Sequence, residues 1–139
     1  LGLKNAGNMM FAESFYWDYD DESRKFADKF MKKMKRMPTA LQAGQYSAIR
    51  TYLKAVEQAQ SDDVADVIKA MKRMRIQDAF AKNGTLRDDG KMVHDMLLVK
   101  VKTPSESKKP WDYYSVQDTV PGKEAFESLD QSKCPLVKK

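Results

Sequence analysis

The stretch Pro38-Thr-Ala-Leu-Gln-Ala-Gly-Gln-Tyr46 divides two helical patterns and decides how the first half of the chain folds. A helix does not readily continue through a proline, so the pattern before Pro38 ends there. Over residues 21–37 the apolar side chains repeat at three and four positions, which predicts an amphipathic helix. A second helix is predicted from about Leu41 to Gln60, and its apolar face is formed by Tyr46, Ile49, Leu53 and Val56.

A third helix follows in the sequence. Ser61 is the predicted N-cap, and Asp62 and Asp63 lie in the first turn, where acidic groups favour the helix dipole. The apolar spacing predicts a stripe of buried residues, which are Val64, Val67, Ile68, Met71 and Met74. The helix ends in basic residues, as the dipole prefers.

Extended segments are predicted on both sides of the helices. Residues 8–17 are aromatic and apolar without helical periodicity, which predicts a strand or an extended crossing segment. Residues 92–102 alternate as one strand, after a reversal at Asp88-Asp89-Gly90, and residues 111–118 are another strand. The chain is therefore predicted to be α/β, with three helices followed by strands and a hairpin.

Composition narrows the classes of protein. The 139 residues include a single cysteine, which excludes an internal disulfide, and no stretch approaches the ~20 apolar residues that span a bilayer. The net charge of +5 is concentrated in two basic runs, at 29–36 and 69–75. Both alternate with apolar residues at helical spacing, which favours solvated helix faces. A basic module that binds nucleic acid is the alternative, because clustered positive charge attracts phosphate.

Catalytic and metal sites are not expected. His94 and Asp95 are adjacent in a predicted strand and would point to opposite faces, so they cannot form a relay. Cys134, near the C-terminus and followed by Pro135, is not expected to be a nucleophile. A zinc site needs several histidine or cysteine ligands, and the acidic residues of 18–22 suit helix capping better than calcium binding. We expect no enzyme activity, no metal and no cofactor.

The order of several motifs resembles the C-terminal portion of periplasmic solute-binding proteins of the branched-chain amino acid type, which serve ABC importers. The resemblance covers nearly the whole chain. It rests on Glu13-Ser-Phe-Tyr-Trp-Asp18, Pro38-Thr-Ala-Leu-Gln-Ala-Gly-Gln-Tyr46, Tyr52-Leu-Lys-Ala-Val56, Asn83-Gly-Thr-Leu-Arg-Asp-Asp-Gly-Lys-Met-Val-His-Asp-Met96, Val99-Lys-Val-Lys-Thr-Pro104 and Pro110-Trp-Asp-Tyr-Tyr114. The tail Ser132-Lys-Cys-Pro-Leu-Val137 resembles a branch linked to aromatic or other organic acids.

The resemblance implies a fragment of a type I periplasmic binding protein, whose two α/β lobes are joined by three hinge crossings. It places a hinge-crossing segment at 1–20, part of the first lobe at 21–102, and a return crossing with a second-lobe tail at 103–139. The start at Leu1, with no initiator methionine and no signal peptide, fits the expectation that upstream residues are missing.

The resemblance also implies site residues and partners. Leu41, five positions before Tyr46, matches a family position that lines the ligand cleft; Gln42, Tyr16 and Trp17 are further candidates from their nearness to it. For the aromatic residues of 11–19, a core role and a role at the cleft both remain open. The expected partners are a small solute and an inner-membrane permease, in the periplasm and without nucleic acid. The fragment is also expected to self-associate through exposed apolar surface.

Overall fold

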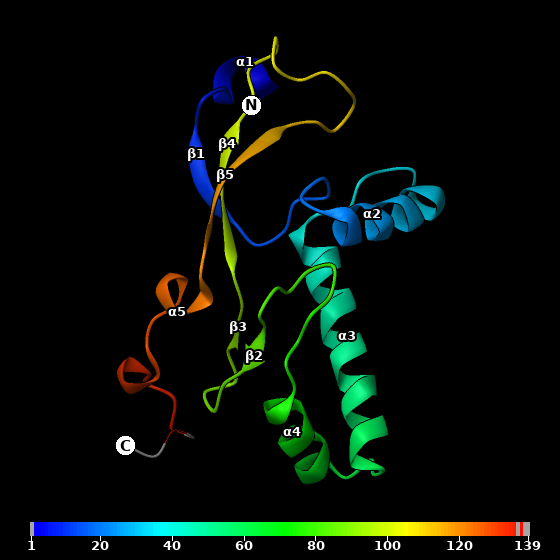
Figure 1. Cartoon of the computed structure of the whole chain (residues 1–139), viewed down its shortest axis with the longest axis vertical. Coiled ribbons are helices and arrows are strands. Elements are labelled where there is room, and N and C mark those ends of the chain that lie inside the picture. Colours follow the sequence, from blue (N-terminus) through cyan, green and yellow to red (C-terminus); the bar gives the residue numbers. More distant parts are fainter. Residues whose placement is uncertain (1, 136, 138–139) are drawn as a thin grey trace.

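The computed structural model describes residues 2–135 and residue 137, and it divides into two bodies (Figure 1). Leu136, which belongs to the predicted tail motif, lies outside the described residues. Residue 1 of the expected segment 1–20 and residues 138–139 of the expected segment 103–139 lie outside them as well. The sheet body contains α1 (Gly2–Ala6), β1 (Met10–Glu13), β4 (Met96–Val101) and β5 (Tyr114–Val120). The helical body contains α2 (Asp21–Met34), α3 (Ala40–Ala59), α4 (Val64–Arg73), β2 (Thr85–Leu86) and β3 (Met92–Val93).

The sheet body is built on an antiparallel sheet in the order β1-β4-β5. Met10 pairs with Lys100, so the outer strand β1 joins a strand that lies far along the sequence. Alternate residues of β4 face inward, and Leu97 and Val99 form the core together with Tyr16. Partly buried aromatic and aliphatic side chains complete this core, namely Phe11, Trp17, Tyr19, Tyr114 and Val116.

The single strand predicted for 92–102 is wrong. The structure breaks it at His94–Asp95 into β3, which pairs with β2, and β4, which pairs with β1 and β5. The cause of the break is tertiary, because the Asp95 carboxylate accepts hydrogen bonds from Asn83 Nδ2 and from the backbone N–H of Gly122, which are distant in the sequence. These bonds turn the chain from one sheet into the other. The reversal predicted before Lys91 is confirmed as the β2–β3 hairpin.

The first two predicted helices are confirmed. The Asp20 side chain caps α2 by accepting from the Ser23 N–H at 2.8 Å, and α2 ends at Met34, three residues before the predicted end. Lys35 ends it because its backbone is left-handed, with φ of 56°. After Pro38, α3 begins at Ala40.

The predicted cap of the third helix is wrong. Asp63, not Ser61, is the N-cap of α4, and its carboxylate accepts from the N–H groups of Ala65 and Asp66. The Ser61 hydroxyl instead accepts from the Asp63 N–H at 3.1 Å, so it supports the capping residue. The predicted burial also fails in part, because Val67 is buried whereas 70% of Val64 and 43% of Ile68 are exposed.

The buried face of α3 is not the apolar face that the periodicity predicts. Its apolar face is exposed over Tyr46, Ile49 and Leu53. Its buried face is made of small residues, which are Ala43, Ser47, Thr51 and Ala55. The loop at 76–81 contacts this small face at Ser47, whose hydroxyl donates to Asp78 Oδ2 at 2.8 Å. Small side chains allow that close approach.

The two basic runs lie on the exposed sides of α2 and α4 and in the turns that follow them, as predicted for solvated faces. Among residues 2–135, no helix has the length and apolar character needed to cross a membrane. The expected lobe boundaries stay a prediction, and the structure adds that β4, at 96–101, shares a sheet with β1 and β5.

Candidate functional site

A cavity of about 250 Å³ lies where the chain leaves β1 and faces the start of α3. Its walls come from both bodies. The sheet body and the segment after β1 contribute an aromatic wall, and the helical body contributes the turn before α3. The lining residues are Glu13, Phe15, Tyr16, Trp17, Met37, Pro38, Thr39, Ala40, Trp111, Tyr113 and Tyr114.

Tyr16 anchors the aromatic wall. Only 6% of it is exposed, and its ring packs against Trp17 and Tyr114 with centroids 6.0 Å and 5.3 Å away. Burial raises the pKa of Tyr16 to about 12, and the nearby carboxylates of Asp112 and Asp18 act in the same direction. The phenol is therefore neutral at physiological pH and can donate a hydrogen bond.

Trp17 is held in place from two sides. Its indole Nε1 donates to the backbone oxygen of Trp111 at 2.9 Å. The Lys109 Nζ lies 4.9 Å from the centroid of the Trp17 ring and pairs with Asp18 at 2.8 Å. A cation over an aromatic face is attracted by the ring quadrupole. Trp111 adopts a left-handed backbone with φ of 67°, which turns the chain between the Lys109 contact and Tyr113.

The start of α3 forms the opposite wall. Pro38 is buried, and Thr39 and Gln42 form a reciprocal cap. Gln42 Oε1 accepts from the Thr39 N–H at 2.8 Å and from the Thr39 hydroxyl at 2.7 Å. This cap fixes the direction in which α3 leaves the cavity.

The four residues expected at the cleft differ in their placement. Tyr16 and Trp17 line the cavity. Leu41 lies one residue beyond the lining of the α3 wall and is 81% exposed, so its side chain is available to a ligand. The side-chain oxygen of Gln42 is occupied by the helix cap.

Sequence reasoning missed the part of the wall that comes from the end of the chain. Trp111, Tyr113 and Tyr114 line the cavity, and the aromatic run Trp-Asp-Tyr-Tyr was the available signal. The sequence does not show this proximity, because it depends on the pairing of both β1 and β5 with β4, which brings Tyr114 into ring contact with Tyr16.

The chemistry of the wall is aromatic and weakly polar. Among the described lining residues Glu13 carries the only formal charge, and its Oε1 accepts from the Ser14 N–H at 2.8 Å. Such a wall can stack on a planar ring or cover a branched aliphatic group. A positively charged group of a ligand can approach Glu13, whereas a ligand carboxylate would need partners from outside this wall.

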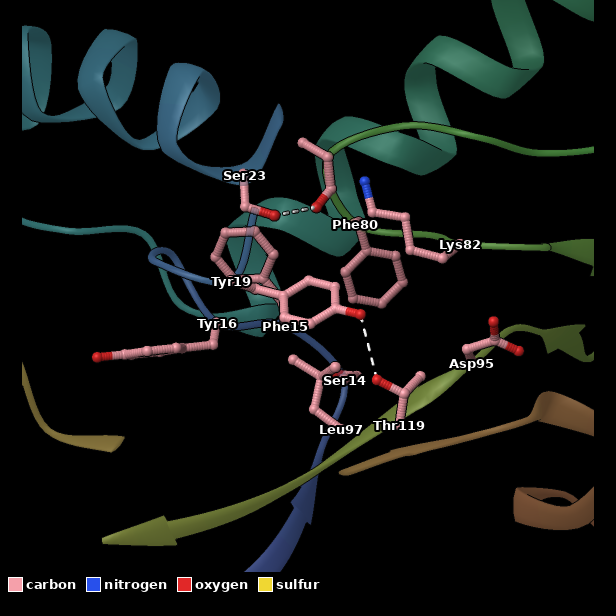
Figure 2. A pocket seen from close by; sticks show the side chains of 11 residues that line it. Ser14, Phe15, Tyr16, Tyr19, Ser23, Phe80, Lys82, Asp95, Leu97 and Thr119 are labelled. Atoms are coloured by element: carbon pink, nitrogen blue, oxygen red, sulfur yellow. Dashed lines mark hydrogen bonds between the residues drawn. The ribbon is translucent and has the colours of Figure 1, made fainter. Parts of the chain in front are cut away.

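A second, much smaller cavity of about 10 Å³ lies at the joint between the bodies (Figure 2). It has room for about one water molecule. In Figure 2 the Tyr19 hydroxyl reaches Thr119 of β5, and the two oxygens are 3.2 Å apart. The Ser23 hydroxyl donates to the backbone oxygen of Ala79 at 3.2 Å. These contacts close the joint, so the cavity is a packing feature and not a ligand site.

His94 is held by ring packing and by a hydrogen bond to the backbone. His94 is 5% exposed, its ring lies between those of Phe80 and Phe126, and its Nδ1 donates to the Asp95 backbone oxygen at 2.8 Å. Cys134 is a free, partly buried thiol. Within the described part of the chain, no three histidine, cysteine or acidic side chains come together as a metal site.

Comparisons with known proteins give the family. The family model described as "Periplasmic binding protein" matches residues 1–109. A periplasmic binding protein from Burkholderia mallei is 47% identical, with a TM-score of 0.93 over 99% of this chain and 36% of that one. A branched-chain amino acid ABC transporter periplasmic ligand-binding protein from Burkholderia xenovorans is 44% identical, with a TM-score of 0.93 over 97% of this chain and 36% of that one.

A more distant structure shares the fold. It is a solute-binding protein of an ABC transporter from Rhodopseudomonas palustris in complex with 3,4-dihydroxybenzoic acid, 16% identical, with a TM-score of 0.72 over 84% of this chain and 32% of that one. Among curated proteins, none matches the chain.

The chain spans about a third of the length of the solved structures that it matches. Its fold is that of type I periplasmic binding proteins, and the proteins of this family are solute-binding receptors rather than enzymes. The family model covers well over half of the chain, and two structures above 40% identity follow it almost from end to end. The chain belongs to the periplasmic binding protein family.

Proposed function

We propose that the chain is the C-terminal portion of the solute-binding component of an ABC uptake transporter, acting in the periplasm. The observation that carries the proposal is the aromatic cavity between the two bodies, in a chain that belongs to this family. A ligand held between two bodies couples its own binding to their relative orientation, so the bound state can be distinguished by a membrane partner. The permease would be that partner.

The exposed surface area of the chain supports the view that it is one part of the receptor. The chain exposes 9201 Å² of surface. A folded monomer of 16.0 kDa typically exposes about 7400 Å². The excess is consistent with faces that are covered by further polypeptide in a complete receptor.

The proposed solute is a branched-chain amino acid or a related aromatic or organic acid. The Burkholderia xenovorans relative is named for branched-chain amino acid transport, and the Rhodopseudomonas palustris protein holds 3,4-dihydroxybenzoic acid. The aromatic wall suits the apolar part of either ligand. Its volume of about 250 Å³ lies just below the range of complete ligand pockets, ~300–1,000 Å³, as expected for one part of a cleft.

Intrinsic fluorescence tests the proposal, because the chain has two tryptophans, Trp17 and Trp111, and both line the cavity. Leucine, isoleucine, valine, benzoate and 3,4-dihydroxybenzoate are titrated into the chain. The same titrations are done on a chimera in which this chain replaces the matching third of the Burkholderia xenovorans protein. We expect saturable binding by the chimera, confirmed by calorimetry, and weak or no binding by the chain alone.

Matched variants locate the binding site. Leu41→Ala and Trp17→Phe in the chimera should weaken binding about tenfold, the loss of ~1–2 kcal/mol of apolar contact. Tyr52→Phe, on the exposed side of α3, should leave the affinity unchanged. Absence of binding by the folded chimera to every ligand, while the intact Burkholderia protein binds one, would overturn the proposed role of this chain.

A further inference from the structure

Three segments connect the two bodies, and they meet at one joint. The first runs from 14 to 20 between β1 and α2, and the second is His94–Asp95 between β3 and β4. The third leaves β5 and leads through Pro121 into α5 (Gly122–Ala125). The chain then packs against the β2–β3 hairpin, where Glu127 accepts from Arg87 Nη1 at 2.6 Å through its backbone oxygen. The third segment therefore returns to the helical body.

One carboxylate ties two of these segments and the helical body together. Asp95 Oδ1 accepts from the backbone N–H of Gly122 at 3.0 Å, in the third segment. Asp95 Oδ2 accepts from Asn83 Nδ2 at 2.6 Å, in the loop before β2. The Asp95 backbone N–H donates to the Lys82 oxygen at 3.0 Å. Both oxygens of a single side chain are thus used, each toward a different part of the molecule.

On one side of this carboxylate lies an open pocket of about 600 Å³, whereas the third and second segments pack closely against each other at Gly122. A Cβ on Gly122 would lie 2.9 Å from the His94 backbone oxygen, so the third segment is pressed directly against the second. The ring of Phe126, just after α5, lies 5.6 Å from that of His94. Close packing transmits a displacement of one segment to the other.

We propose that Asp95 is a positioning residue that sets the angle between the sheet body and the helical body. Two N–H donors converge on it, and a carboxylate can accept both because each of its oxygens is an acceptor. An asparagine has one acceptor oxygen, so it would leave one donor without its bond. Since the walls of the aromatic cavity come from both bodies, this angle sets the width of the cavity. The expected effect on solute affinity rests on the proposed function. The hydrogen bonds from Gly122 and Asn83 to Asp95, which we call the latch, do not depend on it.

Distance measurement between spin labels tests the latch without any ligand. In a Cys134→Ser background, Lys29→Cys on α2 and Gln117→Cys on β5 place one label on each body at exposed positions. Electron double resonance should give one narrow distance distribution for this parent. Asp95→Asn should broaden or displace the distribution. Asp118→Asn is the matched control, an exposed carboxylate on β5, and should leave the distribution unchanged.

Hydrogen exchange shows whether the bond itself has been lost. We expect the protection of the Gly122 amide to fall about tenfold or more in Asp95→Asn, as for a lost bond to a charged acceptor. Unchanged distances together with this loss of protection would overturn the proposal, because the bond would then be broken without moving the bodies. Unchanged protection and unchanged distances would overturn it equally.

A second variant keeps the test decisive if Asp95→Asn does not fold. Asn83 has a left-handed backbone with φ of 54°, which glycine adopts without strain. Asn83→Gly therefore removes the amide that donates to Asp95 Oδ2 and preserves the turn. A broadened distribution is expected here as well, and a distribution identical to that of the parent would count against the latch. Solute titration of the same variants in the chimera then tests the proposed function separately.

Discussion

Single residues at the joint between the two bodies determine how closely the connecting segments pack. Gly122 lies against the second connecting segment so closely that no side chain fits, and its N–H is bound by Asp95. Gly44, by contrast, lies in α3 with Phe80 at an ordinary contact distance of 3.6 Å. A side chain would therefore clash at Gly122 but would fit at Gly44.

Alanine substitution should separate these two glycines. Gly122→Ala should lower the free energy of unfolding by ~1–3 kcal/mol, because a Cβ 2.9 Å from a backbone oxygen forces the segments apart. Gly44→Ala should raise it by up to ~1 kcal/mol, because alanine favours the helix interior. Urea denaturation measures both. A Gly122→Ala protein as stable as the parent would show that the joint tolerates a side chain.

His94 gives the fold a pH dependence. Burial lowers the pKa of His94 below its ordinary value near 6.5; its bond to the Asp95 backbone oxygen and the charges of Asp95 and Asp78 act in the other direction, but burial prevails. The unfolded chain then binds more protons than the folded chain below about pH 6.5, so stability is complete above that pH and declines as the pH falls toward the lowered pKa.

Urea denaturation at a series of pH values from 8 to 5 checks this prediction. The His94→Gln variant, which can still donate to the Asp95 oxygen but does not titrate, should lack the part of the decline that belongs to the histidine. A decline of equal size in both proteins would assign it to carboxylates instead.

At the scale of elements, the helices were predictable and their buried faces were not. Apolar periodicity and the proline at 38 predict α2 and α3 because these signals are local. Ser47 is buried where its hydroxyl meets Asp78, which lies more than 30 positions away, and local spacing contains no information about this contact. The same limit explains the missed break at Asp95, whose partner Gly122 lies 27 positions further along.

The limit of local sequence signals also applies to the candidate site. The family resemblance predicts Tyr16 and Trp17 near the cleft, and both line the cavity. For the aromatic residues of 111–114 the sequence predicts only a strand, because their approach to Tyr16 requires the whole sheet to form. The residues near Tyr16 follow from a motif in one stretch of sequence, whereas those of 111–114 join them through strand pairing.

The inverted burial of α3 can be tested with two alanines of one helix. Ala43 is fully buried, and Ala48 is exposed on the same helix. Ala43→Leu should destabilise the protein by ~1–3 kcal/mol through overpacking, whereas Ala48→Leu should change stability by less than ~0.5 kcal/mol. Thermal unfolding measures the difference. A tolerated leucine at 43 would contradict the tight packing of the small face.

At the scale of the whole molecule, the exposed apolar face of α3 predicts self-association. Tyr46, Ile49 and Leu53 line a groove of about 480 Å³ whose edges carry Arg50, Lys54 and Glu57. Both signs of charge at the edges allow a second copy to approach. We expect light scattering to show dimers or larger species at high concentration, and Ile49→Lys with Leu53→Lys to restore the monomer.

The control for self-association is Ala48→Lys, which adds one charge to an exposed position outside the residues that line the groove. It should leave the association unchanged. A monomeric parent chain at high concentration would show that this face does not associate with itself.

The pairing of β1 with β4 has a consequence for the order of folding. Residues 14–95 lie between these two strands, so the entire helical body is an insertion within the sheet. Contacts within α2, α3 and α4 are local and form quickly, whereas the pairing of Met10 with Lys100 must close a long loop of chain. A folded helical body holds the two ends of that loop near each other. We therefore expect the helices to form before β1 pairs with β4, and substitutions that destabilise the helices to slow that pairing.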